Sequence, residues 1–174
     1  MKTLIAYFSR KGNNYVNGTI RSLSVGNTKA VAEMIAKLTC GDQFEIEPAI
    51  PYSEDYDECT RQALEDLKSG ARPKLRRKLD SIAEYDVIYL GYPNYWGTMP
   101  VHVFLFLESY DFSGKIIMPF CTHEGSGMAN SEIDIRRICP GAKVEKGLAI
   151  HGADVQRAGK AIEKWVWMFQ NGGR

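Results

Sequence analysis

Three short and nearly continuous apolar runs constrain the fold of this chain most strongly. They cover Thr3 to Phe8, Asp86 to Gly91 and Lys115 to Phe120. Apolar runs of this length, without polar alternation, are typical of strands that are buried on both faces, as in a parallel sheet covered by helices. Shorter apolar stretches, Phe44 to Ile46 and the residues around Val144, indicate two flanking strands. The chain therefore favours a buried and mainly parallel sheet.

Segments with helical periodicity lie between these runs. Apolar residues recur every three or four positions in residues 31–38 and again in residues 155–169, so each segment predicts a helix with one apolar face. Further helices are predicted over residues 55–69, 101–110 and 131–139. Strands that alternate with one-sided helices predict an α/β fold, a three-layer α-β-α sandwich with helices on both faces of the sheet.

Composition and charge argue against several classes of function. A length of 174 residues with 44% hydrophobic content predicts one domain, residues 1–174, with a core of its own. The 22 basic and 21 acidic side chains leave a net charge of +1, so the chain lacks the positive excess that attracts nucleic acid or anionic membranes. The first apolar run is too short for a secretory signal, and no apolar run is long enough to span a bilayer. We expect a cytoplasmic protein that neither binds nucleic acid nor inserts into a membrane.

The cysteines indicate no metal centre. Cys40, Cys59, Cys121 and Cys139 are widely spaced and form no CxxC pair, so the spacing of metal ligands is missing. Free cysteines behave as small apolar residues, and we expect buried or half-buried thiols.

Two irregular stretches and two charge runs remain outside the predicted strands. Residues 11–25 and 48–73 are both longer than ordinary connections between strands and helices. An acidic run covers residues 54–58 and a basic run covers residues 72–78. The usual explanation of such runs is a solvated face. The alternative for the basic run is recognition of an acidic partner or of a nucleotide phosphate.

The segment after the first strand ends at the start of a helix and favours an anion site. In an open parallel sheet, ligands bind beyond the carboxyl ends of the strands, near the point where the strand order reverses. Here the sequence reads Gly26-Asn27-Thr28 at the start of the first periodic helix. Gly26 permits a close backbone approach, and the free N–H groups of a helix start bind anions such as phosphate. An ordinary helix cap by Asn27 or Thr28 explains the same residues.

The segments after the two central apolar runs are rich in aromatic residues and glycines. Residues 91–100 place three aromatic side chains in a turn, and residues 121–130 contain two glycines and two hydroxyl side chains. Aromatic residues held at the end of a sheet form a flat apolar wall for a planar ligand, with loop amides available to its polar edge. The alternative is a loop that fills the core.

Taken together, these segments resemble the flavodoxin family over nearly the whole chain. The resemblance rests on Tyr7 to Arg10, Gly26 to Thr28, Asp55 to Asp57, Tyr85 to Ile88, Gly91 to Thr98, Phe120 to Gly127 and Gly147 to Ile150. It implies a five-stranded parallel sheet in the order 2-1-3-4-5, with FMN at the switch point between strands 1 and 3. Two features depart from typical flavodoxins: an insertion at residues 11–25 divides the phosphate loop, and the chain is neutral rather than acidic.

The resemblance also implies a set of cofactor-binding residues. The phosphate of FMN would be held before and at the start of the first helix, the isoalloxazine ring by the loop at 93–98, and its pyrimidine edge by the loop at 122–127. The residues implied are Ser9, Arg10, Asn27, Thr28, Pro93, Asn94, Tyr95, Trp96, Gly97, Thr98, Thr122, His123, Glu124, Gly125 and Gly127. No catalytic side chains and no metal are needed, because the flavin carries the electron chemistry.

These residues predict a redox protein that passes electrons through FMN between a reductase and an acceptor protein. The alternative is an oxidoreductase that uses NAD(P)H to reduce quinones or similar small molecules, and a further alternative is a domain that has lost flavin. Stacking on Tyr95 or Trp96 would lower the flavin potential. A protonated His123 would raise it near pH 6 to 7, roughly the ordinary imidazole range, whereas His102 is expected to be a packing or surface residue. The sequence makes no prediction of the oligomeric state.

Overall fold

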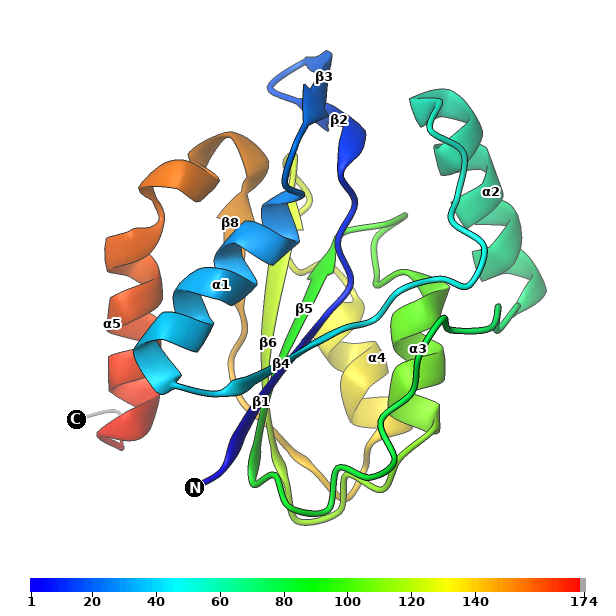
Figure 1. The fold of residues 1–174 in the computed structure, drawn as a ribbon. Helices are drawn as coiled ribbons and strands as arrows, with labels where there is room; N and C mark the ends of the chain where they lie inside the picture. Colours follow the sequence, from blue (N-terminus) through cyan, green and yellow to red (C-terminus); the bar gives the residue numbers. More distant parts are fainter. Residues whose placement is uncertain (173–174) are drawn as a thin grey trace.

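A twisted parallel sheet between two layers of helices forms the centre of the molecule, as the computed structural model of residues 1–172 shows (Figure 1). The strands β4 (Asp42–Glu45), β1 (Thr3–Tyr7), β5 (Val87–Pro93), β6 (Ile116–His123) and β7 (Lys143–Val144) lie side by side in this order. A last strand, β8 (Leu148–His151), also pairs in parallel with β6, beyond β7. The predicted α/β class, parallel sheet and order 2-1-3-4-5 are confirmed, with the fifth position divided between β7 and β8.

Helices cover both faces of this sheet. α1 (Asn27–Thr39) and α5 (Gly159–Gln170) pack on one face, and α3 (Val101–Glu108) and α4 (Ser131–Ile138) on the other (Figure 1). The buried apolar residues form two clusters accordingly, one on each side of the sheet. The predicted continuous helix over residues 155–169 is wrong in one respect, because a 3₁₀ helix, η1 (Gly152–Arg157), precedes α5. Among the described residues, no helix is both long and apolar enough to cross a membrane.

The inserted segment 11–25 forms a β-hairpin that projects beyond the carboxyl ends of the sheet strands (Figure 1). Its strands, β2 (Gly12–Val16) and β3 (Thr19–Leu23), are antiparallel. Asn17 and Gly18 connect them with φ values of +52° and +88°, the positive pair that a two-residue type I′ turn requires. The predicted irregular stretch at residues 11–25 is therefore wrong, and Asn-Gly between two short strands is the hairpin signal that could have indicated it.

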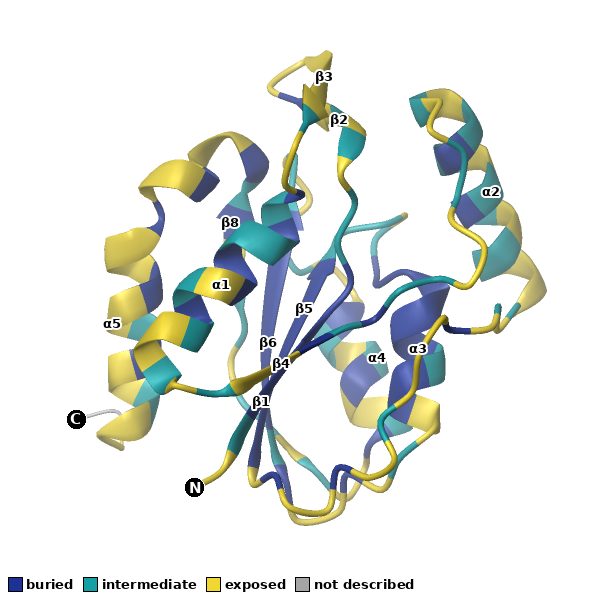
Figure 2. Cartoon of the chain, viewed as in Figure 1, coloured by how far each residue is buried: buried dark blue, intermediate teal, exposed yellow. Residues whose placement is uncertain are grey.

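The other long connection contains α2 (Tyr56–Ser69), which stands at the same end of the sheet. The Asp55 side chain accepts a hydrogen bond from the backbone N–H of Glu58 at 2.9 Å and so caps the helix. Only Cys59 and Ala63 of α2 are buried (Figure 2). The helix predicted over residues 55–69 is therefore confirmed as a peripheral helix with a narrow apolar stripe.

Ion pairs occupy part of the basic run at residues 72–78. Arg72 binds the Glu108 carboxylate at 2.8 Å, and Arg76 and Arg77 lie 3.5 and 3.4 Å from Glu47. Arg77 and Arg72 also lie over aromatic rings of the core. The run stabilises the outer surface of the α/β unit, as the solvated-face interpretation predicts.

Three of the four cysteines are buried, as the sequence predicts. Burial raises the pKa of the Cys121 thiol to about 12 and that of the Cys139 thiol to about 11. Cys40 is exposed, in contrast to the expectation, because it forms the left-handed C-cap of α1 with a φ of +52°.

Candidate functional site

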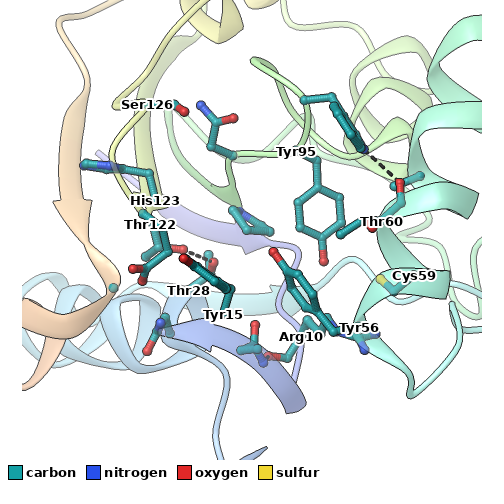
Figure 3. Close-up of a pocket in the computed structure, with 18 of the residues that line it drawn as sticks. Arg10, Tyr15, Thr28, Tyr56, Cys59, Thr60, Tyr95, Thr122, His123 and Ser126 are labelled. Atoms are coloured by element: carbon teal, nitrogen blue, oxygen red, sulfur yellow. Dashed lines mark hydrogen bonds between the residues drawn. The ribbon is translucent and has the colours of Figure 1, made fainter. Parts of the chain in front are cut away.

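A pocket of about 430 Å³ opens at the carboxyl ends of the sheet strands, between the hairpin, α2 and the loops that follow β5 and β6 (Figure 3). Its volume lies within the range of small-molecule and cofactor sites. Its lining consists of Arg10, Asn14, Tyr15, Asn27, Thr28, Tyr56, Cys59, Thr60, Ala63, Pro93, Asn94, Tyr95, Trp96, Gly97, Thr122, His123, Glu124, Ser126 and Gly152.

The start of α1 forms one end of this pocket. Gly26 precedes the helix, and a Cβ atom there would overlap Ser9 Oγ and lie 2.5 Å from the backbone oxygen of Arg10. Only glycine therefore lets the two parts of the divided loop come together. Ser9 Oγ accepts a hydrogen bond from the backbone N–H of Lys29 at 3.1 Å. The first turn of α1 contains no acidic residue, so the helix dipole and its N–H groups favour an anion here.

Arg10 brings a positive charge to the same end of the pocket. Its guanidinium donates through Nε to the carbonyl oxygen of Asn13 at 3.0 Å and through Nη2 to that of Glu54 at 3.1 Å. Asn13 Nδ2 donates to the same Glu54 oxygen at 3.2 Å. These bonds fix the base of the hairpin against the segment before α2 and leave other guanidinium donors for a ligand.

Asn94 joins the loop after β5 to the loop after β6. Its Nδ2 donates to the carbonyl oxygen of Gly127 at 2.9 Å, and its Oδ1 accepts from the backbone N–H of Gly97 at 3.0 Å. Trp96 and Gly97 adopt positive φ values of +54° and +81°. Thr98 closes the turn behind the pocket, where its hydroxyl donates to Asp134 at 2.6 Å. The Asn94 side chain therefore joins the two loops, together with backbone bonds from Asn94 N–H to the Thr122 carbonyl and from Asn130 N–H to the Gly97 carbonyl, both 2.9 Å.

Aromatic side chains form the opposite side of the pocket. Tyr95 packs edge-on against Phe8 at 5.9 Å between ring centroids, and its buried hydroxyl has no hydrogen-bond partner among the described residues. Trp96 is more than half exposed and donates from its indole nitrogen to the Thr60 carbonyl at 2.9 Å. Tyr15 and Tyr56 stack at 6.1 Å, which links the hairpin to α2. A flat ligand would meet aromatic surface on several sides.

Polar side chains from the end of β6 face the start of α1. Thr122 shares a buried hydrogen bond of 2.8 Å with Thr28. His123 accepts a hydrogen bond at Nδ1 from the N–H of Gly125 at 2.9 Å, so its proton lies on Nε2 in the neutral ring. Burial, together with His151 at 5.7 Å, lowers the pKa of His123. Glu124 acts in the opposite direction, and the net effect is that this imidazole becomes charged only at a lower pH than an unperturbed histidine.

Most of the residues implied by the resemblance line the pocket together. Four others do not line it but support it: Ser9, Thr98, Gly125 and Gly127. Ser9 and Thr98 hold the segments before α1 and after β5, Gly125 orients His123, and Gly127 binds Asn94. Direct contact of these four with a cofactor stays a prediction.

The hairpin and α2 provide a side of the pocket that was not predicted from the sequence. These two elements add Asn14, Tyr15, Tyr56, Cys59, Thr60 and Ala63 to the lining, and η1 adds Gly152; Ser126 also lines the pocket, within the loop at 122–127 that the resemblance implies. Asn-Gly at residues 17–18 could have revealed the hairpin that carries Tyr15. Nothing in the spacing of α2 shows that Cys59 and Ala63 face a pocket rather than a core, because either requires an apolar stripe.

The fold and the position of the pocket define a doubly wound α/β protein with a ligand site at the switch point of its sheet. The model of the flavodoxin family matches residues 2–168. The chain therefore belongs to the flavodoxin family, and the resemblance found in the sequence is confirmed.

Solved structures give the same result. A candidate flavoprotein from Bacteroides uniformis is 32% identical, with 95% of this chain and 97% of that chain covered and a TM-score of 0.73. A candidate flavoprotein from Bacteroides eggerthii is 28% identical, with 96% of each chain covered and a TM-score of 0.75. A flavoprotein from Lactobacillus acidophilus, solved in complex with FMN, is 20% identical over 95% of this chain and 98% of that chain, with a TM-score of 0.64. No curated protein matches the chain.

Proposed function

We propose that this chain binds FMN in the pocket at the carboxyl ends of β1, β5 and β6 and passes electrons through it between a reductase and an acceptor protein. One observation carries the proposal: the start of α1 and the loops after β5 and β6 meet at a single pocket that has an anion-binding end and an aromatic side. The FMN complex of the Lactobacillus acidophilus flavoprotein, which has the same fold, supports the choice of cofactor.

The residues present fit the chemistry of FMN. A phosphate suits the start of α1, where the first turn carries no acidic residue and Arg10 adds a positive charge. α2 and α4, by contrast, have acidic residues in their first turns. A planar ring suits the side formed by Tyr95, Trp96 and Tyr56. The buried Tyr95 hydroxyl without a partner is a further polar group available to a ligand.

Bound FMN supplies the electron transfer, and the side chains bind, orient and shield it. The start of α1 holds the anionic end, and the Asn94 bonds to Gly97 and Gly127 keep the two sheet-end loops at a fixed separation. The hairpin and α2 exclude water from one side through the stacked pair Tyr15 and Tyr56. Trp96, at the rim and more than half exposed, lies where a partner protein can approach.

The proposal is tested by a flavin titration followed by anaerobic reduction. The purified protein is stripped of flavin and titrated with FMN, and the spectrum is recorded before and after anaerobic addition of NADPH. The dithionite-reduced holoprotein is then mixed with oxidised cytochrome c as an acceptor. Thr28→Val removes a pocket hydroxyl and should weaken FMN binding. Thr39→Val is the control, because it makes the same change at the far end of α1. There the hydroxyl bonds only to the Ile35 carbonyl and the Gly41 N–H, so FMN binding should be unchanged.

The outcomes separate the two candidate functions. An electron carrier binds FMN, stays oxidised with NADPH alone and reduces cytochrome c once reduced itself. Bleaching by NADPH alone would instead make the chain an NAD(P)H-dependent reductase of quinones or similar small molecules. The basic run at residues 72–78 gives that alternative no support, because none of it lines the pocket and three of its arginines are paired with Glu108 and Glu47. If the purified protein does not bind FMN, both candidate functions are contradicted.

A further inference from the structure

Glu124, a residue that lines the pocket, has a buried carboxylate oxygen without a hydrogen-bond donor among the described residues. Glu124 follows β6, and its Oε2 accepts a hydrogen bond from the backbone N–H of Asn17 in the hairpin turn at 3.0 Å. The same oxygen lies 3.5 Å from His151 Nε2. The other oxygen, Oε1, is buried and has no partner among the described residues. An acceptor removed from water without a donor costs free energy, so a ligand that brings a donor to Oε1 recovers that cost.

The position of this oxygen defines the part of a ligand that it can meet. A Cβ atom on Gly152 would overlap Glu124 Oε1 and lie 2.8 Å from Asn27 Nδ2. Glycine at 152 therefore leaves room for the carboxylate beside the start of α1. Figure 3 shows Thr28, Thr122 and His123 at this side of the pocket and Tyr95, Thr60 and Cys59 at the other. The acceptor thus lies beside the start of α1, across the pocket from Tyr95.

If the ligand is FMN, the missing partner is a neutral donor, because the flavin carries no cationic group. A phosphate group is an anion and would be repelled by the carboxylate. A hydroxyl group donates to a carboxylate without repulsion, as the ribose hydroxyl does to the acidic residue of dinucleotide-binding sites. We propose that Glu124 is a specificity-determining residue that accepts a hydrogen bond from a hydroxyl group of the ribityl chain of the flavin. This inference rests on the proposed function, because it assumes that the ligand is a flavin.

Glu124→Gln tests the inference with little disturbance of the fold. The amide keeps one oxygen that can accept from the Asn17 N–H, and it replaces Oε1 by an NH₂ group that cannot accept a hydrogen bond. Glu54→Gln is the matched control, because it removes one exposed negative charge near the hairpin base from a side chain that does not line the pocket. The apoproteins are titrated with FMN, with riboflavin, which lacks the phosphate, and with lumiflavin, which lacks the ribityl chain.

The inference predicts a selective loss. Glu124→Gln should weaken binding of FMN and of riboflavin by about tenfold to a hundredfold, the range for a hydrogen bond to a charged group, and should leave lumiflavin binding unchanged. Glu54→Gln should change none of the three. The thermal midpoint of the Glu124→Gln apoprotein should change little, because the amide oxygen still accepts from the Asn17 N–H and one unsatisfied buried group replaces another.

Other results contradict the inference. An equal loss for all three flavins would mean that Glu124 acts on the ring that they share, or by holding the hairpin through Asn17, and not on the ribityl chain. Tighter FMN binding with unchanged riboflavin binding would mean that the carboxylate faces the phosphate. Unchanged binding of all three would show that Oε1 contacts no ligand. A wild-type protein that binds none of the flavins contradicts the proposed function itself, whereas normal wild-type binding with no selective loss contradicts only the role of Glu124.

Discussion

The two walls of the pocket differ in how they are attached to the rest of the molecule. The inner wall consists of the start of α1 and the loops after β5 and β6, and the outer wall consists of the β2–β3 hairpin and α2. The inner wall continues strands that are almost entirely buried. In the outer wall, Val16 is the one buried residue of the hairpin strands, and only Cys59 and Ala63 of α2 are buried (Figure 2).

The contacts between the walls are few and mostly polar. Trp96 donates to the Thr60 carbonyl and the Asn17 N–H donates to Glu124, while the Tyr15–Tyr56 stack joins the two parts of the outer wall to each other. Segments with little buried apolar surface open locally at low free energy, whereas segments continuous with the core open only with global unfolding. The inner wall should therefore set the orientation of a ligand and the global stability, and the outer wall should set access.

Gly26→Ala should give the largest loss of stability. The new Cβ would meet the Arg10 backbone at 2.5 to 2.8 Å, and backbone cannot move away as a flexible side chain can. We expect a loss of about 3 kcal/mol in the free energy of unfolding, measured by urea denaturation. Gly18→Ala is the control in the outer wall: it has a φ of +88° but nothing within 4 Å, so backbone strain alone should cost about 1 kcal/mol. Equal losses in the two variants would contradict the division into two walls.

His102 should make the stability depend on pH where α3 meets the segment before α2. The imidazole stacks on Phe8, meets Tyr52 edge-on, and has neither nitrogen hydrogen-bonded among the described residues. Burial lowers its pKa from 6.5 to about 4, while Asp66 acts in the opposite direction. Between pH 6.5 and about 4, His102 is therefore protonated in the unfolded chain but neutral in the folded chain.

This linkage should lower the free energy of unfolding by about 2 kcal/mol between pH 7 and pH 5, with little effect above pH 7. His102→Leu removes the titrating group without breaking a hydrogen bond and should flatten that part of the pH profile in urea denaturation. A wild-type profile that is already flat from pH 5 to 7 would show that water reaches His102.

The inner wall was predictable from the sequence, and the outer wall was not. Val87 to Gly91 and Ile116 to Phe120 had to be strands because continuous apolar runs need burial on both faces. Once these strands are parallel, their carboxyl ends meet at one edge, and Tyr95 and Thr122 fall at the same site. The sheet topology therefore brings the residues of the inner wall together at one site.

The hairpin and α2 depend on contacts that no periodicity encodes. Tyr15 and Tyr56 are 41 positions apart in the chain and stack only because two long connections bend over the same pocket. Glu124 and Asn17 lie further apart still in the chain. Their hydrogen bond uses the backbone N–H of Asn17, which almost any residue type would offer, so the sequence does not indicate it. The division of the last predicted helix into η1 and α5 at Ala158 could not be predicted either, because the apolar spacing continues across it.

Asn94→Ala should disturb the inner wall locally. It removes the bonds to Gly97 and Gly127 that fix the separation of the two sheet-end loops. We expect a loss of about 1 to 2 kcal/mol in the free energy of unfolding and about tenfold weaker FMN binding. Asn13→Ala removes one exposed bond to the Glu54 carbonyl in the outer wall and should cost about 0.5 kcal/mol. A larger effect of Asn13→Ala on affinity would reverse the roles assigned to the two walls.

Tyr15→Ala should have the smallest effect on stability and should sharpen the comparison most. Tyr15 is 41% exposed and contributes to the pocket through its stack on Tyr56, so the free energy of unfolding should fall by only about 0.5 kcal/mol. Loss of the stack also makes local opening of the outer wall easier. The FMN dissociation rate, measured by stopped-flow fluorescence, should therefore rise by a larger factor than a change of about 0.5 kcal/mol in the free energy of unfolding would give. Ile20→Ala, on the same hairpin but outside the pocket lining, should leave the rate unchanged. If Tyr15→Ala instead lowers stability by as much as Asn94→Ala, the hairpin belongs to the cooperative core, and access to the pocket must be controlled by α2 alone.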